Sequence, residues 1–528
     1  MDTASLNIVT SALLLLCESD GNPLIPGTTS DQVSPTRVTS TENLDKSLAA
    51  GIAWSAGAKW CSQLISWASF VIVTRLLVPS DFGLVGMAVL YCGLFQVATD
   101  AFATAVTTLR DLTGEQLAQL NTVALMLGFL TCLISCGLAV PLGHFFRSPG
   151  LPLVLVVMST MFLISGLRVV PYGLLYRDMR FRLLSILEAT QTVAQALTML
   201  AFAWLGFRYW TLVLGNIVGA ATLAALQISW RPCRFAWPRV SAMKSALTFS
   251  GHIMVSNLSW YGFTNADFLV AGRMLGQAAL GAYTLAWTLA TIPLEKVTAI
   301  VSGVSYAYFS AAQNDHAALR RYLRILTEGL SLLTFPATIG LALVANDFVH
   351  LVLGAKWQGT ILPLEILAFY ASFRCLVTLL PPILNVTGES RFVMRMMQTA
   401  LILMPTAFYV GSRWGPAGIA YGWVIAYPVI ALCICRRTLR KITMPWQEYL
   451  DAIRPALTGS LVMAATVEIL KRTLTSSFPL SVRFGVEVLA GGAIYVLTLT
   501  VFHRDRLSVF WNFVKALRDP VRVNAIVE

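Results

Sequence analysis

The chain has 528 residues, of which 56% are hydrophobic and only 12% are charged, and its formal net charge at pH 7 is +12. Soluble domains carry about twice that charged fraction, so the composition excludes a chain built mainly from soluble domains. Because Lys and Arg lie in alternate short loops, and not in one patch with interleaved aromatic residues, the positive charge does not indicate nucleic-acid binding.

Runs of about 20 apolar residues, each long enough to cross roughly 30 Å of hydrocarbon, recur between Gly51 and Val501. The runs are continuous rather than alternating, which predicts membrane-spanning helices and not the strands of a barrel. In chain order the expected helices lie at 51–76, 82–107, 119–141, 152–175, 184–206, 209–230, 246–272, 279–302, 323–345, 359–384, 393–411, 416–435, 454–473 and 482–502. The expected fold class is an all-α polytopic membrane protein with about 14 transmembrane helices.

Polar breaks divide this series of helices into segments. Residues 1–48 predict a disordered cytoplasmic tail, because much of that segment is polar and rich in Ser, Thr, Pro and Gly. Six expected helices in 49–235 form an N-terminal lobe, six in 236–440 form a C-terminal lobe, and 441–502 adds a helix pair. Residues 503–528 predict a cytoplasmic tail whose apolar and aromatic residues suit a short interfacial helix.

The positive charges between helices predict the orientation. One set of helix ends and loops contains Arg110, Arg177, Arg180, Arg182, Arg231, Arg234, Arg239, Lys244, Arg320, Arg321, Arg324, Arg391, Arg395, Arg436, Arg437, Arg440 and Lys441. The opposite set holds mainly Arg147, Arg208, Lys356, Arg413, Lys471 and Arg472. The richer side faces the cytoplasm by the positive-inside rule, and an even number of helices then places both termini there.

Two pairs of matching segments indicate an internal repeat. Arg75–Gly83 and Arg273–Gly281 each place an arginine eight residues before a glycine, at the end of a helix. Pro171–Phe181 and Pro382–Phe392 align a proline, an acidic residue and an Arg-Phe pair. Corresponding helices run in the same direction, so we expect a parallel repeat, which is typical of secondary transporters that hold substrate between two rocking halves.

Polar residues inside apolar runs are candidate site residues, because an ionisable side chain at bilayer depth costs several kcal/mol unless it faces protein or water. Lys59 and Gln63 lie one turn apart on the first expected helix, with Trp60 and Trp67 nearby. Two interpretations stay open: a cavity face that offers a cation, an amide and aromatic surfaces to a sugar phosphate, or ordinary helix packing.

Arg168 and Arg374 lie in the fourth expected helix of each group, well inside apolar sequence. Two guanidinium groups at related depths suit a diphosphate, whose oxygens accept bidentate hydrogen bonds. The alternative is pairing with Glu188 or Glu365 within each bundle.

Asp267 and Arg273 of the seventh expected helix either pair with each other or contact substrate. The candidate cavity residues are together Lys59, Gln63, Arg75, Arg168, Asp267, Arg273 and Arg374. The candidates for ion coupling or gating are Asp100, Glu295 and Lys296.

Catalytic and metal-binding motifs are missing from the sequence. It contains no Walker A loop, no HExxH and no GxSxG motif. Its nine cysteines form no CxxC pair, and its five histidines are scattered singly. We therefore expect no catalytic residues, no metal and no cofactor, and direction would come from a proton or sodium gradient or from consumption of the product.

Three segments carry a resemblance to a known family: TRLLVPSDFG at Thr74–Gly83, DFLVAGRMLGQAALGAYTLAW at Asp267–Trp287 and LVLGAKW at Leu351–Trp357. They resemble the Wzx-type polysaccharide transporter (PST) flippases of the multidrug/oligosaccharidyl-lipid/polysaccharide (MOP) superfamily, especially the colanic acid and exopolysaccharide branch. The resemblance covers roughly Gly51 to Arg440.

This resemblance implies a MATE-like fold, with two six-helix lobes around a cationic cavity and an added C-terminal helix pair. It also implies a flippase that moves an undecaprenyl-diphosphate-linked oligosaccharide repeat unit across the bacterial inner membrane, from the cytoplasmic to the periplasmic leaflet. The product would serve exopolysaccharide or lipopolysaccharide biosynthesis, with polysaccharide polymerase and export machinery as partners. The alternatives are a MATE-like ion-coupled exporter of small molecules and, less favoured because the outer loops are short, a membrane polymerase or ligase.

Overall fold

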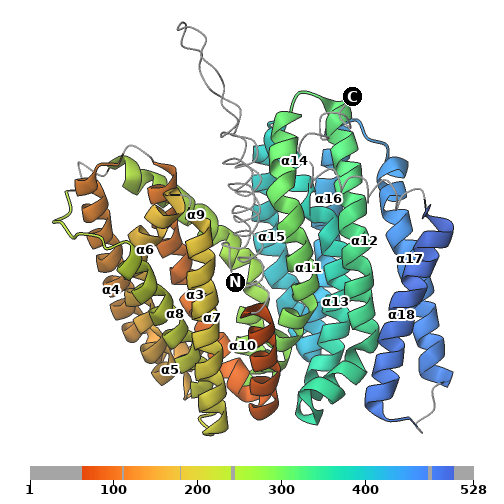
Figure 1. Ribbon diagram of the computed structural model, residues 1–528, viewed down its shortest axis with the longest axis horizontal. Helices are drawn as coiled ribbons and strands as arrows, with labels where there is room; N and C mark the ends of the chain where they lie inside the picture. The colour runs from red at the N-terminus through yellow and green to blue at the C-terminus, as the bar shows by residue number, and fades with distance from the viewer. Residues whose placement is uncertain (1–61, 110–111, 179, 240–243, 474–477, 505–528) are drawn as a thin grey trace, which may run out of the picture. The chain divides into compact units, whose positions relative to one another are not determined.

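The structure is a computed structural model that describes residues 62–504, apart from 110–111, 179, 240–243 and 474–477 (Figure 1). Every regular element in this part of the chain is a helix. Ten helical stretches within it are long and apolar enough to cross a membrane. One of them, 390–441, contains two antiparallel helices, since Glu389 at its start bonds Arg437 near its end. The protein is a multi-pass membrane protein. Lys59 and the expected terminal tails lie outside the described residues, apart from the first two positions of the C-terminal tail.

The contacts divide the described chain after Gly281 into two compact units. In the first unit, residues 62–76 are helical. The helices that follow are α3 (Pro79–Thr108), α4 (Gly114–Phe145), α5 (Leu151–Met158), α6 (Thr160–Arg177), α7 (Phe181–Trp204), α8 (Trp210–Trp230), α9 (Lys244–Thr264) and α10 (Ala266–Leu275), and then the first turn of α11 (Gln277–Ala311).

The second unit begins with the rest of α11. It continues with α12 (His316–Phe348), the π-helical turn η3 (Val349–Leu353), the 3-10 turn η4 (Ala355–Thr360), α13 (Ile361–Thr378), α14 (Leu380–Val386), α15 (Ser390–Gly411), the 3-10 turn η5 (Ser412–Trp414), α16 (Gly415–Lys441), α17 (Trp446–Thr473) and α18 (Leu480–Phe502).

Local sequence signals set several helix starts. Pro79 opens α3, and the backbone N–H of the preceding Val78 donates to the Asp81 side chain. Thr113 caps α4 in a reciprocal capping box with Gln116. Asp315 caps α12 by accepting from the two amides that follow His316, at 2.8 and 3.1 Å. Each cap satisfies N–H groups that have no partner inside their own helix.

Three helices expected to be continuous are interrupted. The stretch 152–175 breaks at Ser159, whose hydroxyl donates to the Val156 carbonyl. The stretch 246–272 breaks at Asn265, whose side-chain amide donates a hydrogen bond to the Tyr261 carbonyl. The stretch 359–384 breaks at Leu379, because the two prolines that follow have no N–H to donate.

The two glycines of the Arg-to-Gly repeat meet in the first unit. A Cβ on Gly83 would lie 2.5 Å from the Gln277 carbonyl carbon and closer still to its oxygen. A Cβ on Gly281 would lie 2.8 Å from the Pro79 carbonyl carbon and 2.9 Å from the Gly83 nitrogen. The first turns of α3 and α11 therefore cross with backbone against backbone, which only glycine permits at these positions.

Candidate functional site

Each of the two arginines expected to bind substrate lies in a group of polar and aromatic residues within the membrane helices of its own unit. The first group, the Arg168 cluster, consists of Gln96, Asp100, Ser165, Arg168, Tyr172 and Glu188 on α3, α6 and α7. The second group, the Arg374 cluster, consists of Trp287, Tyr370, Arg374, Trp423 and Tyr427 on α11, α13 and α16.

A chain of hydrogen bonds links α6 to α3 in the Arg168 cluster. The Ser165 hydroxyl donates to Gln96 Oε1 at 2.7 Å, and Gln96 Nε2 donates to Asp100 Oδ1 at 3.1 Å. Tyr172, one turn from Arg168, lies within electrostatic range of Glu188, Arg168 and Asp100. The cluster thus brings one cation and two carboxylates to a single region of the first unit.

Arg168 is half-buried in this cluster. Among the described residues it forms no ion pair with a carboxylate, so the expected alternative of direct pairing with Glu188 is not realised. A guanidinium that is not ion-paired with a carboxylate keeps donors for an anionic ligand.

Arg374 lies against aromatic rings in the second unit. Its guanidinium carbon is 5.8 Å from the centroid of the Trp287 ring, within the range of a cation–π contact. The Trp287 ring is 5.2 Å from Trp423, which is 5.0 Å from Tyr370. Tyr427 stands edge-on to Tyr370 at 5.3 Å. The result is a cation beside a cluster of tilted and edge-on aromatic rings.

Buried contacts hold the aromatic rings in place. Trp423 is 2% exposed, and its indole N–H donates to the Tyr283 hydroxyl at 3.2 Å. Phe408 from α15 covers another side of Trp423 at 5.0 Å. Trp423 and Tyr370, both 2% exposed, therefore pack inside the unit, and of the rings in this cluster only Trp287 and Tyr427 are half-buried beside the guanidinium.

Asp267 and Arg273 do not pair with each other. Asp267 is fully buried in the first turn of α10, where its carboxylate accepts from the Phe268 amide at 2.9 Å. The Arg273 guanidinium lies over the Phe145 ring, 5.2 Å from its centroid. Of the two alternatives, a direct pair between them is therefore not formed, and the contacts seen are a carboxylate at a helix start and a cation–π contact.

The remaining described candidates lie on the helix of residues 62–76 and on α11. Gln63 is half-buried and Arg75 is exposed, both on the helix of residues 62–76. Glu295 and Lys296 are exposed neighbours on α11. Of the candidates expected to couple ions, only Asp100 lies in one of the two clusters.

A sequence profile described as "Polysaccharide biosynthesis protein" matches residues 72–362, which is more than half of the chain. The chain belongs to this family. The match covers the first unit from residue 72, including Arg168, and ends at residue 362 in the first turn of α13, before Arg374.

Relatives of this family member align over most of its length. The teichuronic acid biosynthesis protein TuaB of Bacillus subtilis is 24% identical over 87% of this chain and 96% of TuaB. The lipopolysaccharide biosynthesis protein WzxC of Escherichia coli is 24% identical over 71% of this chain and 77% of WzxC. Among solved structures, the lipid II flippase MurJ in an inward closed conformation superposes with a TM-score of 0.70 at 14% identity, covering 86% of this chain and all of MurJ. The fold is therefore that of MurJ.

The sequence did not single out a further charged cluster in this family member. Arg483 on α18 forms two hydrogen bonds to Asp347 at the end of α12, at 2.6 and 2.7 Å. Glu487, fully buried one turn further along, lies 3.9 Å from Arg483. Lys471 on α17 donates to the Leu343 carbonyl. These contacts attach the C-terminal helix pair to α12, and the four-residue spacing of Arg483 and Glu487 within an apolar run was the signal that could have revealed them.

Proposed function

We propose that the protein is a flippase that moves a polyprenyl-diphosphate-linked oligosaccharide from the cytoplasmic to the periplasmic leaflet of the bacterial inner membrane. The observation that carries this proposal is membership of the polysaccharide biosynthesis family, supported by alignment with TuaB over 87% of the chain. The MurJ-like fold is consistent with it. No enzyme activity is part of the proposal.

The two arginine clusters supply the chemistry that this substrate needs. In each unit separately, we assign the substrate's phosphate groups to the guanidinium of Arg168 or of Arg374, and a sugar to the half-buried Trp287 ring beside Arg374. The polyprenyl tail would stay in lipid while the headgroup crosses through a polar path. Gln63, Arg75 and Lys59 remain proposed cavity residues, whereas Asp267 and Arg273 have less support because of their structural contacts.

Alternating access follows from the internal repeat. In this proposal, about 14 transmembrane helices form two six-helix lobes and a C-terminal pair, with both termini in the cytoplasm. A proton or sodium gradient, acting through Asp100 or the Glu295–Lys296 pair, or consumption of the product by a polymerase and export machinery gives the movement its direction. A small-molecule exporter of the same superfamily has less support, because the family is one of polysaccharide biosynthesis.

The arginine assignment is tested by purified variants in vesicles that contain a lipid-linked oligosaccharide. We expect Arg168→Ala and Arg374→Ala each to slow leaflet transfer at least tenfold, since a charge-assisted hydrogen bond contributes about 1.5 to 3 kcal/mol. Arg413→Ala, which removes an exposed arginine of η5, is the matched control and should transfer at the wild-type rate. Full activity of both cluster variants would refute the assignment.

A further inference from the structure

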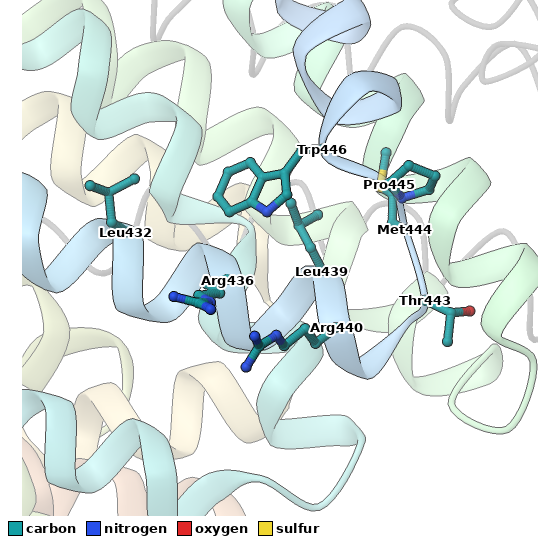
Figure 2. A pocket seen from close by; sticks show the side chains of 8 residues that line it. All are labelled: Leu432, Arg436, Leu439, Arg440, Thr443, Met444, Pro445 and Trp446. Carbon is teal, nitrogen blue, oxygen red and sulfur yellow. The ribbon is translucent and has the colours of Figure 1, made fainter.

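A recess lies at the junction of α16 and α17, on the side that the charge distribution assigns to the cytoplasm. It has a volume of about 700 Å³, and Figure 2 shows the side chains that line it. Arg436 and Arg440 come from one face of α16, together with Leu432 and Leu439, and Trp446 comes from the first turn of α17. This α16–α17 recess is separate from the Arg374 cluster on the membrane-embedded part of α16.

The two arginines of the recess carry uncompensated charge. Both are exposed, and neither forms an ion pair with a carboxylate of the described residues. Their neighbours on the same helix differ: Arg437 and Lys441 lie 2.8 and 3.6 Å from the Glu389 carboxylate. Within a single helix end, one face is therefore neutralised by protein and the other is available to an external anion.

The apolar side chains of the recess place it at the edge of the bilayer. Leu432, one turn before Arg436, is 56% exposed on a membrane-spanning helix, so it faces lipid. Trp446 is 42% exposed, and indole rings prefer the headgroup level, where one part of the ring is apolar and the N–H is solvated. The recess thus combines a cationic part with a lipid-facing part at headgroup depth.

The end of α16 fixes the shape of the recess. Thr443 adopts a left-handed conformation with φ of 55°, and the Met444 amide donates to the Leu439 carbonyl at 2.8 Å. This is the bond of a Schellman motif, in which the residue after the left-handed position packs an apolar side chain; Met444 is only 5% exposed. The Thr443 carbonyl also accepts from Arg320 of α12 at 3.4 Å. Two arginines and an indole are therefore held on a defined turn.

We propose that the α16–α17 recess binds the phosphodiester headgroup of an anionic phospholipid of the cytoplasmic leaflet. The guanidinium groups of Arg436 and Arg440 contact the phosphate, Trp446 covers the glycerol region, and the exposed Leu432 contacts the upper acyl chain. A basic recess between membrane helices, with an indole at its rim, has the composition of a specific lipid site rather than of diffuse surface charge.

A matched control separates this site from general positive charge on the cytoplasmic side. Arg391 and Arg395 are also exposed, are also one turn apart, lie on the neighbouring helix α15 and form no ion pair with a described carboxylate. They line neither of the recesses found at this end of the unit. Arg391→Ala/Arg395→Ala therefore removes the same charge from the same side and leaves the recess intact.

Native mass spectrometry of the full chain in an uncharged detergent measures the binding directly. The probe is dioctanoyl phosphatidylglycerol, and dioctanoyl phosphatidylcholine is the zwitterionic comparison. We expect one saturable phosphatidylglycerol site. Its affinity should fall roughly 30-fold in Arg436→Ala/Arg440→Ala, because each basic residue near an anionic surface contributes about 1 kcal/mol of binding free energy. The control variant should bind as the wild type does, and unchanged thermal unfolding without lipid should verify that the double variant is folded.

Equal binding of the two lipids, equal weakening in both double variants, or wild-type binding by Arg436→Ala/Arg440→Ala would each overturn the proposal. A transport measurement distinguishes an anionic phospholipid from the diphosphate of a transported substrate as the ligand of the recess. In vesicles of phosphatidylcholine alone, Arg436→Ala/Arg440→Ala should transfer lipid-linked oligosaccharide at the wild-type rate, and a loss of transfer there would identify the substrate as the ligand instead. The binding measurement remains decisive even if the protein transfers no such substrate.

Discussion

Replacing Gly83 by alanine should separate the first turns of α3 and α11. The added Cβ would lie 2.5 Å from the Gln277 carbonyl carbon, whereas real Cβ atoms keep at least 3.0 Å from a neighbouring atom, so the helices must move apart by at least half an ångström. The atoms in contact are backbone atoms and have no alternative rotamer. Overpacking of this kind lowers the free energy of unfolding by about 3 kcal/mol. The higher helix propensity of alanine offsets about 1 kcal/mol of this loss.

The expected net loss is thus about 2 kcal/mol, which corresponds to a decrease in melting temperature of about 4 to 8 °C for a unit of this size. Tryptophan fluorescence of the purified protein during heating measures it. Gly137→Ala is the matched control: Gly137 also lies within a helix, but a Cβ there meets nothing within 4 Å. We expect this control to leave the melting temperature unchanged or to raise it.

Gly281→Ala tests the same crossing from its other side. A single separation of the helices relieves both clashes, so the double variant Gly83→Ala/Gly281→Ala should lose less stability than the two single losses added together. Equal melting temperatures for Gly83→Ala and Gly137→Ala, or strictly additive losses in the double variant, would refute the close backbone crossing.

Two further predictions concern ion pairs. Hydrogen bonds from Arg437 lower the pKa of Glu389, so the stability that this pair contributes is complete above the ordinary glutamate pKa of about 4.3 and is lost as the pH falls through the lowered value. Glu389→Gln should therefore lower the melting temperature at pH 7 and have little effect well below pH 4, and a constant difference at all pH values would contradict this. Asp347→Asn removes the carboxylate that accepts both short hydrogen bonds from Arg483, leaves only Glu487 at 3.9 Å, and should cost about 3 kcal/mol in thermal unfolding. Asp451→Asn at an exposed position of α17 should cost nothing, and equal effects would contradict a stabilising role for the Asp347–Arg483 pair.

The sequence predicted helices well because the membrane imposes their length and apolar character. Expected ends were less accurate where charged residues extend a helix beyond the apolar run: α12 starts at His316, seven residues before the expected start at 323. Arg320 and Arg321 fall in this added turn, where long side chains reach the aqueous interface while the backbone remains helical. Hydropathy reports the span in hydrocarbon, not the full helix.

The environment of the candidate arginines could be predicted only in part. Arg168 and Arg374 were identified as intramembrane charges, but the rings beside Arg374 come from three helices, and no local pattern relates Trp287 to Trp423. Conversely, Asp267 looked like a site residue although it accepts a backbone amide at the start of α10, because the break at Asn265 that creates this helix start is not visible in hydropathy. Contacts formed by tertiary packing are absent from sequence periodicity.

The Arg-to-Gly repeat relates two sequence positions that are in contact in the structure. Gly83 and Gly281 were matched only by their distance from an arginine, and in the first unit they form the two sides of one close crossing. The contacts group α9 and α10 with α3, whereas the repeat places the expected lobe boundary at 235. We keep the repeat-based lobes as the proposed arrangement, because the two pairs of matching segments lie at corresponding helices of the two expected groups of six.

Leaflet transfer in vesicles tests the proposed function most directly. The purified protein would be reconstituted with a polyprenyl-diphosphate-linked oligosaccharide that carries a label on its sugar, and a membrane-impermeant reagent would measure how much label becomes accessible with time. We predict rapid, protein-dependent exposure of the label that slows in Arg168→Ala and Arg374→Ala. Exposure no faster than in protein-free vesicles, with folded protein and with a proton or sodium gradient applied in either direction, would contradict the proposed flippase function.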